Sequence, residues 1–129
     1  MNNTQKLFNL AVAAAKNAYC PYSKFAVGAA ISADDGKMYA GCNVENISYP
    51  VGTCAEAGAI AAMIAGGGHK IQEMLIYADS QQLISPCGAC RQRICEFAAP
   101  DVVVHLANTK GIQKSVTIAD LLPYSFSEF

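Results

Sequence analysis

Apolar residues recur at helical spacing in the first part of this chain. Between residues 5 and 18 they fall on one face, which predicts an amphipathic helix that Thr4 can cap and that stops near Pro21. Residues 27–32 and 37–43 instead alternate between apolar and polar, on either side of Asp34-Asp35-Gly36. An Asp-Gly pair between two alternating runs predicts a β-hairpin.

The remaining two thirds of the chain alternates between helical and extended patterns. The pattern predicts, in order, an Ala-rich helix at 54–65 ended by three glycines, a strand at 71–78, a helix at 86–97, a strand at 102–107, a further strand at 116–118 and a short helix at 119–122. Strands that alternate with helices after a hairpin predict a mixed sheet covered by helices. The 129 residues are expected to form one domain, 1–129.

Two segments of this pattern allow a second interpretation. The apolar run at 7–15 faintly resembles a signal peptide, but Asn9 interrupts it and Lys16 ends it, so the helix is preferred. The small residues that surround the 54–65 helix fit either close packing on the sheet or a contact between subunits, and both interpretations stay open. The chain has no apolar stretch of about 18 residues, so no membrane-spanning helix is expected.

Composition narrows the class of partner. The chain is 53% hydrophobic and 15% charged, with a formal net charge of −1 and no basic run. Binding to a nucleic acid polymer requires many cations that neutralise phosphates, so a free small molecule is the expected partner. The six cysteines include a C-x-x-C pair, which suits a metal or redox centre in a reducing compartment, and a cytoplasmic location is expected.

Two short segments carry the candidate chemistry. Cys54-Ala55-Glu56 is followed, thirty-three residues after Cys54, by Pro86-Cys87-Gly88-Ala89-Cys90. Three thiolates on zinc leave the fourth position open for water, as in a catalytic site. Glu56 is then placed to move the proton of that water.

The spacing of these residues also predicts how they meet. Cys87 and Cys90 are three apart, so both can face one point from the first turn of a helix that Pro86 introduces. Cys54 and Glu56 are two apart and share a target only if it lies beyond the helix end. Both helices should therefore direct their N-termini at the metal, where each contributes about half a positive charge to offset the excess charge of three thiolates.

Two other kinds of site use the same residues. The C-x-x-C pair could be a redox pair, or a fourth ligand could close a structural zinc site; the candidates are Cys20, Cys42, Cys95, His69 and His105. Neither explains Glu56 or Pro86. His69, beside the glycine run, is expected in a solvated loop, and His105 is expected to be a satisfied histidine of its strand.

The order of these motifs resembles the small, three-cysteine zinc cytidine deaminases. Cys-Ala-Glu followed by Pro-Cys-x-x-Cys is the signature of zinc nucleoside deaminases. Four blocks match the same family in order, and the third contains the second half of this signature: Pro21-Tyr22-Ser23-Lys24-Phe25-Ala26-Val27-Gly28-Ala29-Ala30, Asn43-Val44-Glu45-Asn46-Ile47-Ser48-Tyr49, Ser85-Pro86-Cys87-Gly88-Ala89-Cys90-Arg91-Gln92 and Leu121-Leu122-Pro123-Tyr124-Ser125-Phe126. The match covers nearly the whole chain.

The resemblance implies a fold, a reaction and an assembly. The fold would be a three-layer α/β/α sandwich with a mixed sheet of about five strands. The reaction would be hydrolytic deamination of cytidine and deoxycytidine to the uridines, with release of ammonia, in pyrimidine salvage. The implied assembly is a homotetramer, with one Zn²⁺ per subunit and the active sites at subunit interfaces.

The resemblance also implies residue roles. Cys54, Cys87 and Cys90 would bind zinc, and Glu56 would carry protons. The substrate-binding residues would be Asn43 and Glu45 for the ribose hydroxyls, Phe25 near the base, Ala55 and Ser85 through their backbones, and Phe126 from a neighbouring subunit.

This sequence departs from the family pattern in two places. Many relatives have Arg directly after the catalytic Glu, where this chain has Ala57. Arg93, three residues after Cys90, is either a replacement for that cation or a solvated residue that pairs with Glu96 or Asp101. Pro50-Val51-Gly52-Thr53 is the second departure, and it leaves open a different cytosine nucleoside, such as an antibiotic or a modified base, as substrate. A non-enzymatic structural-zinc module is the third hypothesis.

Overall fold

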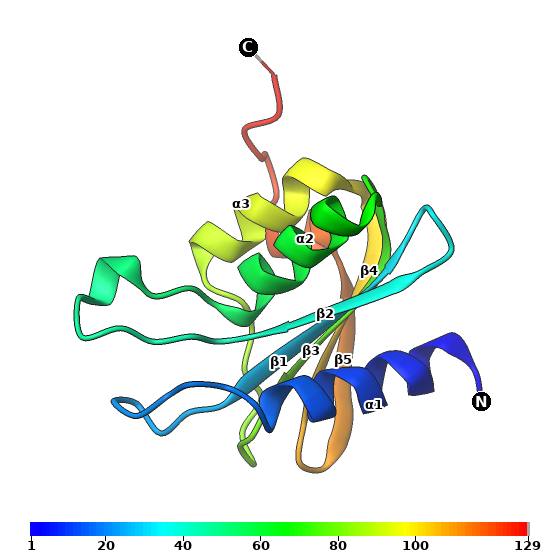
Figure 1. Cartoon of the computed structure of the whole chain (residues 1–129). Coiled ribbons are helices and arrows are strands. Elements are labelled where there is room, and N and C mark those ends of the chain that lie inside the picture. The colour runs from blue at the N-terminus through cyan, green and yellow to red at the C-terminus, as the bar shows by residue number, and fades with distance from the viewer. Residues whose placement is uncertain (129) are drawn as a thin grey trace.

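The computed structural model describes residues 1–128, which form one five-stranded sheet with helices on both faces (Figure 1). In chain order the elements are α1 (Asn3–Ala15), β1 (Val27–Ala33), β2 (Met38–Cys42), the 3₁₀ turn η1 (Tyr49–Val51), α2 (Ala55–Gly66), β3 (Ile71–Ala78), α3 (Gly88–Phe97), β4 (Ala98–Asn108), β5 (Gly111–Thr117) and α4 (Ile118–Leu121). The strand order in the sheet is β2-β1-β3-β4-β5. Only β3 and β4 are parallel, so the predicted mixed sheet is confirmed.

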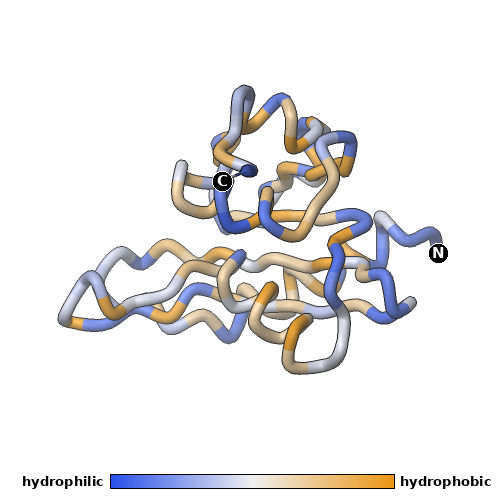
Figure 2. The backbone as a smooth tube through the Cα atoms, turned by 90° about the horizontal axis from the view of Figure 1, so that it is seen from above, coloured by the Kyte–Doolittle hydropathy of each residue, from blue (hydrophilic) through white to orange (hydrophobic). Residues whose placement is uncertain are grey.

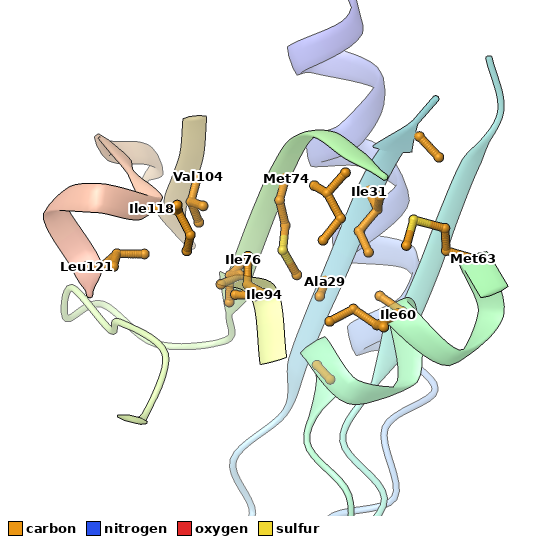
Figure 3. Packing of buried hydrophobic residues seen from close by; sticks show 14 of the residues in the cluster. Ala29, Ile31, Ile60, Met63, Met74, Ile76, Ile94, Val104, Ile118 and Leu121 are labelled. Carbon is orange, nitrogen blue, oxygen red and sulfur yellow. The ribbon is translucent and has the colours of Figure 1, made fainter. Parts of the chain in front are cut away.

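Both faces of the sheet are buried because successive strand residues point to opposite sides. On β1, Ala29 and Ile31 pack with the buried residues of α2, α3 and α4. Ala30, between them, packs with Leu7 and Ala11 of α1 on the other face. Figure 3 shows the first of these clusters, in which side chains of α2 meet those of the central strands. The predicted three-layer α/β/α arrangement is therefore confirmed, with α1 alone on one face.

The first helix begins and ends earlier than its apolar pattern predicts. Asn2, not Thr4, is the N-cap, and its Oδ1 accepts a hydrogen bond from the backbone N–H of Gln5 at 2.8 Å. The helix ends at Ala15 because the chain after it turns away and pairs with the segment that follows β2. Tyr19 N–H donates to the carbonyl of Asn43 at 3.0 Å.

The last two strands are longer than their apolar residues indicate. β4 begins at Ala98 and β5 at Gly111, where the sequence predicted strands at 102–107 and 116–118. β5 is an edge strand, and most of its residues are exposed. An edge strand is formed by backbone hydrogen bonds and needs few apolar side chains, so hydropathy detected only its half-buried end.

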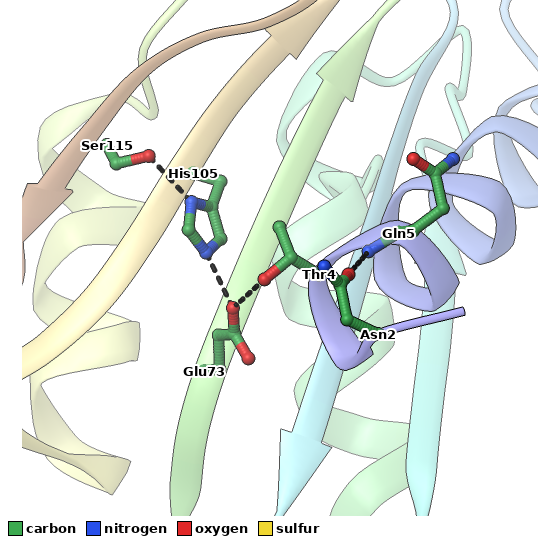
Figure 4. A network of polar contacts seen from close by, with 6 residues as sticks. All are labelled: Asn2, Thr4, Gln5, Glu73, His105 and Ser115. Atoms are coloured by element: carbon green, nitrogen blue, oxygen red, sulfur yellow. Dashed lines mark hydrogen bonds and ion pairs between the residues drawn. The ribbon is translucent and has the colours of Figure 1, made fainter.

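A polar network ties α1 to three strands on the face that α1 covers (Figure 4). Glu73 Oε2 accepts a hydrogen bond from the hydroxyl of Thr4 at 2.7 Å and lies 2.6 Å from Nε2 of His105. The other ring nitrogen of His105 lies 2.7 Å from Oγ of Ser115. His105 is thus satisfied within its sheet, as predicted, while His69 is exposed in a loop.

Hydrophobic and hydrophilic residues are interleaved along the chain (Figure 2). Within residues 1–128, every helix is too short or too polar to cross a lipid bilayer. The six cysteines are all free thiols.

Candidate metal centre

Two helix N-termini bring the candidate metal ligands together. Cys54 is the N-cap of α2 and Cys87 is the N-cap of α3, and both cap residues have extended backbone. Glu56 follows in the first turn of α2, and Cys90 in the first turn of α3. The prediction from spacing that both helices begin at one site is confirmed by this placement.

Three donor atoms form a compact group at that site. One ligand atom each from Cys54, Glu56 and Cys90 lies within 4.8 Å of the other two, and Glu56 and Cys90 are buried. Two sulfurs bound tetrahedrally to one zinc at about 2.3 Å would lie about 3.8 Å apart, which this spacing accommodates. Thiolates are preferred zinc ligands, so the donor set fits the ion.

The pKa values of the Cys54 and Cys90 thiols are shifted in opposite directions. A hydrogen bond from Cys90, and to a lesser extent the backbone N–H of Ala57 and the charge of Arg93, hold the pKa of Cys54 well below its usual range. The same hydrogen bond, together with burial, raises the pKa of Cys90. Zinc binds cysteine as the thiolate, so a metal held by both sulfurs requires both to be deprotonated.

Glu56 lies almost completely out of contact with bulk water. Its exposed fraction is 5%, and burial is the main reason that its pKa is raised above the ordinary value, with the nearby Cys54 thiolate adding to the effect. A carboxyl whose pKa is raised by burial holds a proton more readily than an exposed carboxyl does, which suits a group that takes up and returns protons.

Cys87 lies close to the group but outside it. Its side chain is exposed at the N-cap of α3, and its sulfur does not join the donor atoms of Cys54, Glu56 and Cys90 within 4.8 Å. It is near enough for its charge to contribute to the raised pKa of Cys90. Its role as a third sulfur ligand stays a prediction.

Two arginines of α3 have different partners. Nη1 of Arg93 lies 3.6 Å from Sγ of Cys54 and 3.5 Å from Sγ of Cys90, so it bonds the sulfurs rather than Glu96 or Asp101. Arg91 instead fixes the chain around the metal helix. It donates to the carbonyls of Pro86 at 2.8 Å and Leu121 at 2.9 Å, and to Oγ of Ser85 at 3.1 Å.

An open cleft adjoins the donor group. It has a volume of about 510 Å³, and its lining includes Cys54, Asn43, Glu45 and Tyr49. The predicted ribose-binding pair and one predicted zinc ligand therefore face the same space.

Asn43 has a structural role as well as a place in the cleft. Its Oδ1 accepts from the N–H of Val27 at 2.9 Å, and its Nδ2 donates to the carbonyl of Phe25 at 2.8 Å. These bonds hold the chain that leads into β1. One amide N–H and one lone pair remain for a ligand, since an asparagine amide offers two of each.

Glu45 is held by Tyr22 and Ser23, two residues to which the sequence had assigned no role. Its Oε1 accepts from the backbone N–H groups of Tyr22 and Ser23 at 3.0 and 3.1 Å, and its Oε2 accepts from the Ser23 hydroxyl. These bonds, the Ser23 hydroxyl first, hold the pKa of Glu45 below its ordinary value. Ser23 lies in a block that matches the family, but one sequence gives no signal of this contact.

The other predicted substrate residues do not line this cleft. Phe25 is half-buried beside it, Ala55 is fully buried at the start of α2, and Ser85 is exposed before Pro86. The side chain of Phe126 is 66% exposed on the C-terminal segment, where its carbonyl accepts a bond from Gln92 at 3.1 Å.

Comparison with known proteins gives one family. Residues 1–106 match the family described as "Cytidine and deoxycytidylate deaminase zinc-binding region". A cytidine deaminase from Sporosarcina psychrophila is 43% identical over 126 residues, covering 98% of this chain and 93% of that protein. The crystal structure of cytidine deaminase from Burkholderia pseudomallei superposes with a TM-score of 0.90 at 40% identity, covering 98% of this chain and 100% of that one. Blasticidin-S deaminase from Bacillus cereus is more distant, with 32% identity over 113 residues that cover 81% of this chain and 79% of that protein.

Proposed function

The chain belongs to the family of zinc-binding cytidine and deoxycytidylate deaminases, and we propose that it converts cytidine and deoxycytidine to uridine and deoxyuridine with release of ammonia. One observation carries the proposal. The buried carboxyl of Glu56 and the sulfurs of Cys54 and Cys90 converge within 4.8 Å at the starts of two helices. A closed structural zinc site has no need of such a carboxyl, whereas hydrolysis needs a group that moves protons.

Cys54, Cys87 and Cys90 would hold one Zn²⁺ in each subunit. When bound there, zinc lowers the pKa of water and so supplies a nucleophile near neutral pH. The N-termini of α2 and α3 favour the thiolate forms of these cysteines, because their partial positive charges lie at the sulfurs.

Glu56 would be the proton carrier. It would accept a proton from the attacking water and deliver it to the ring nitrogen next to the amino-bearing carbon, which makes that carbon electrophilic. It would then take the second proton of that water from the hydroxyl now on the ring carbon and pass it to the amino group, so that the carbonyl forms and ammonia leaves. Burial supports this role because it raises the pKa of Glu56 toward the working pH.

Asn43 and Glu45 would bind the sugar hydroxyls. Asn43 retains one donor and one acceptor after bonding Val27 and Phe25, and Glu45 offers acceptors on a carboxylate fixed by Ser23. Phe25 would stack near the base, and the backbones of Ala55 and Ser85 would read its polar edge. A pair of ribose readers favours a nucleoside over a free base.

The wider setting of the reaction belongs to the proposal too. We expect a role in pyrimidine salvage in the cytoplasm, and a homotetramer in which Phe126 of one subunit closes the pocket of its neighbour. The exposure of Phe126 in the single chain is in keeping with such a contact. A related cytosine nucleoside antibiotic is the alternative substrate, because a blasticidin-S deaminase is among the relatives.

An assay on a panel of substrates tests the function. The purified protein, loaded with zinc, is mixed separately with cytidine, deoxycytidine, blasticidin S and cytosine, and loss of substrate absorbance and release of ammonia are followed. Turnover of the two cytosine nucleosides, lost with a chelator and regained with zinc, is expected. Activity on blasticidin S alone would select the alternative. No activity on any of them, together with four protein ligands on zinc by X-ray absorption, would favour a structural module.

A further inference from the structure

The candidate metal centre concentrates negative charge. Zinc with three thiolates has one negative charge in excess, and the carboxylate of Glu56 lies within 4.8 Å of two of those sulfurs. The N-termini of the two helices offset part of this charge. Their partial positive charges do not cancel both the excess charge of the thiolates and the charge of the Glu56 carboxylate. The arrangement therefore calls for a full cation close to the sulfurs.

Arg93 supplies a cation at that place. Cys90 and Arg93 are three residues apart on α3, so their side chains lie on the same face of the helix. Nη1 of Arg93 reaches Cys90 Sγ at 3.5 Å and Cys54 Sγ at 3.6 Å, and so bridges ligands from two helices. Among residues 1–128, Arg93 is the one cationic side chain with a hydrogen bond to these sulfurs.

The other arginine of the helix does not compete for this role. All three nitrogens of the Arg91 guanidinium donate hydrogen bonds, to Pro86, Leu121 and Ser85. The Arg93 side chain is exposed, so its place beside the sulfurs is not imposed by burial in the core. Ala57, which follows Glu56, cannot contribute a charge.

We propose that Arg93 is a positioning residue of the metal centre, whose guanidinium donates to the Cys54 and Cys90 thiolates and offsets their charge while zinc is bound. This inference rests on the proposed zinc site. An N–H donated to a thiolate lowers the energy of the sulfur lone pairs, which weakens electron donation to the metal and leaves zinc a stronger Lewis acid. It also reduces the repulsion between the sulfurs and Glu56, which favours retention of the ion.

Zinc release and a cobalt spectrum test the inference without an activity assay. Zinc-loaded wild type, Arg93→Gln and Arg93→Lys are mixed with excess chelator, and the half-time of zinc release is measured. Loss of a residue that supports metal ligands typically costs about 10–100-fold, so release from Arg93→Gln should be at least about tenfold faster, with Arg93→Lys in between. In the cobalt-substituted proteins, the sulfur-to-cobalt charge-transfer band of Arg93→Gln should move to longer wavelength.

Lys6→Gln is the matched control, because Lys6 is an exposed cation on α1, across the sheet from the centre. Its release rate and cobalt band should equal those of wild type. Wild-type values in Arg93→Gln, or an equal change in Lys6→Gln, would overturn the inference. Failure of wild type to deaminate cytidine would refute the proposed function instead and would leave both of these readouts intact.

Discussion

Ser23 holds Glu45 through two groups at once: its backbone N–H donates to Oε1 at 3.1 Å and its hydroxyl donates to Oε2. The contact joins the loop before β1 to the segment after β2. Because both carboxylate oxygens are engaged, the orientation of Glu45 toward the cleft is fixed before a ligand arrives. A fixed acceptor loses less entropy on binding than a mobile one.

The first prediction concerns this contact. Ser23→Ala should lower kcat/KM for cytidine about tenfold, because a hydrogen bond to a charged group contributes about 1.5–3 kcal/mol and part of it is replaced by water. The loss should appear mainly in KM. Steady-state kinetics with cytidine and with 2′,3′-dideoxycytidine, which lacks the 2′ and 3′ hydroxyls of the sugar, provides the measurement.

The dideoxynucleoside distinguishes loss of the contact with the sugar from a general loss of activity in Ser23→Ala. If Glu45 binds a hydroxyl, Ser23→Ala should change kcat/KM for that substrate little. Ser115→Ala is the matched control, because it removes a serine hydroxyl that contacts His105 far from the cleft. An equal loss on both substrates would show that Ser23 does not act through the sugar.

The second prediction concerns proton transfer. Glu56→Gln keeps the shape of a side chain that is 5% exposed but cannot carry a proton, so kcat should fall by about 10²–10⁴-fold or more. Zinc content, measured by elemental analysis, should stay at the wild-type level. Substantial turnover in a zinc-loaded Glu56→Gln protein would exclude Glu56 as the proton carrier.

The sequence predicted the elements whose formation depends on buried apolar residues. The bounds of β3, Ile71–Ala78, were predicted correctly because this central strand is a nearly continuous buried run. β5 was detected only at its end, because an edge strand with exposed side chains leaves little hydropathy signal. The N-cap of α1 was assigned to Thr4 instead of Asn2, since both residue types cap helices and the sequence does not show that Thr4 bonds Glu73.

The candidate site was likewise predictable only where local spacing determines it, and not where it depends on contacts between distant segments. Convergence of Cys54 with Cys90 follows from local spacing and from the fact that helix N-termini attract thiolates, both of which are readable in sequence. The bonds of Arg93 to the sulfurs could be placed only as one of two alternatives, because they depend on how α2 and α3 pack. Ser23 was missed because its contact with Glu45 joins residues twenty-two apart through a loop, in which Lys24 adopts a left-handed backbone with φ of 59°.

The third prediction concerns the contact between β2 and α2. A Cβ added at Gly41 would lie 2.3 Å from the backbone N of Ala59, whereas one added at Gly58 would meet nothing closer than 3.5 Å. Gly41→Ala should therefore reduce the free energy of unfolding by about 1–3 kcal/mol, through overpacking. Gly58→Ala, the matched control across the same contact, should be neutral or stabilising by up to about 1 kcal/mol, because alanine is favoured in a helix.

Urea unfolding of both glycine variants, followed by circular dichroism, gives these free energies. Equal stability of Gly41→Ala and wild type would mean that the sheet and α2 are not as closely packed as described. A destabilised Gly58→Ala would mean that this face of α2 contacts something other than β2.

The fourth prediction concerns pH. Backbone N–H groups of His69 and Lys70 donate to Oδ1 of Asp34 at 2.9 and 3.1 Å and lower its pKa from the ordinary value of 3.8. A carboxyl with a lowered folded-state pKa stabilises the fold above its unfolded-state pKa, and this contribution is lost as the pH falls through the folded-state pKa. The difference in melting temperature between wild type and Asp34→Asn should thus be larger at about pH 6 than at about pH 3.

Asp101→Asn controls for the loss of one exposed negative charge in this comparison. Its difference from wild type should not follow the pattern of Asp34→Asn. A melting-temperature difference for Asp34→Asn that grows toward low pH would contradict the assignment of these hydrogen bonds.

The fifth prediction concerns the metal and the role of Cys87. A ligand that binds only the folded state at 100 times its dissociation constant stabilises a protein by about 2.7 kcal/mol, so removal of zinc should lower the melting temperature by several degrees. Cys54→Ser and Cys90→Ser should abolish that zinc-dependent shift, since their sulfurs belong to the donor group. Cys87→Ser should abolish it too, although its sulfur lies outside the group, because three thiolates rather than two are needed to leave zinc a single open position. Cys95→Ser is the control: this free cysteine lies further along α3, and its variant should keep the full shift. An unchanged shift in Cys87→Ser would reduce the centre to two sulfurs and make Glu56 a ligand, which would end its assignment as the proton carrier.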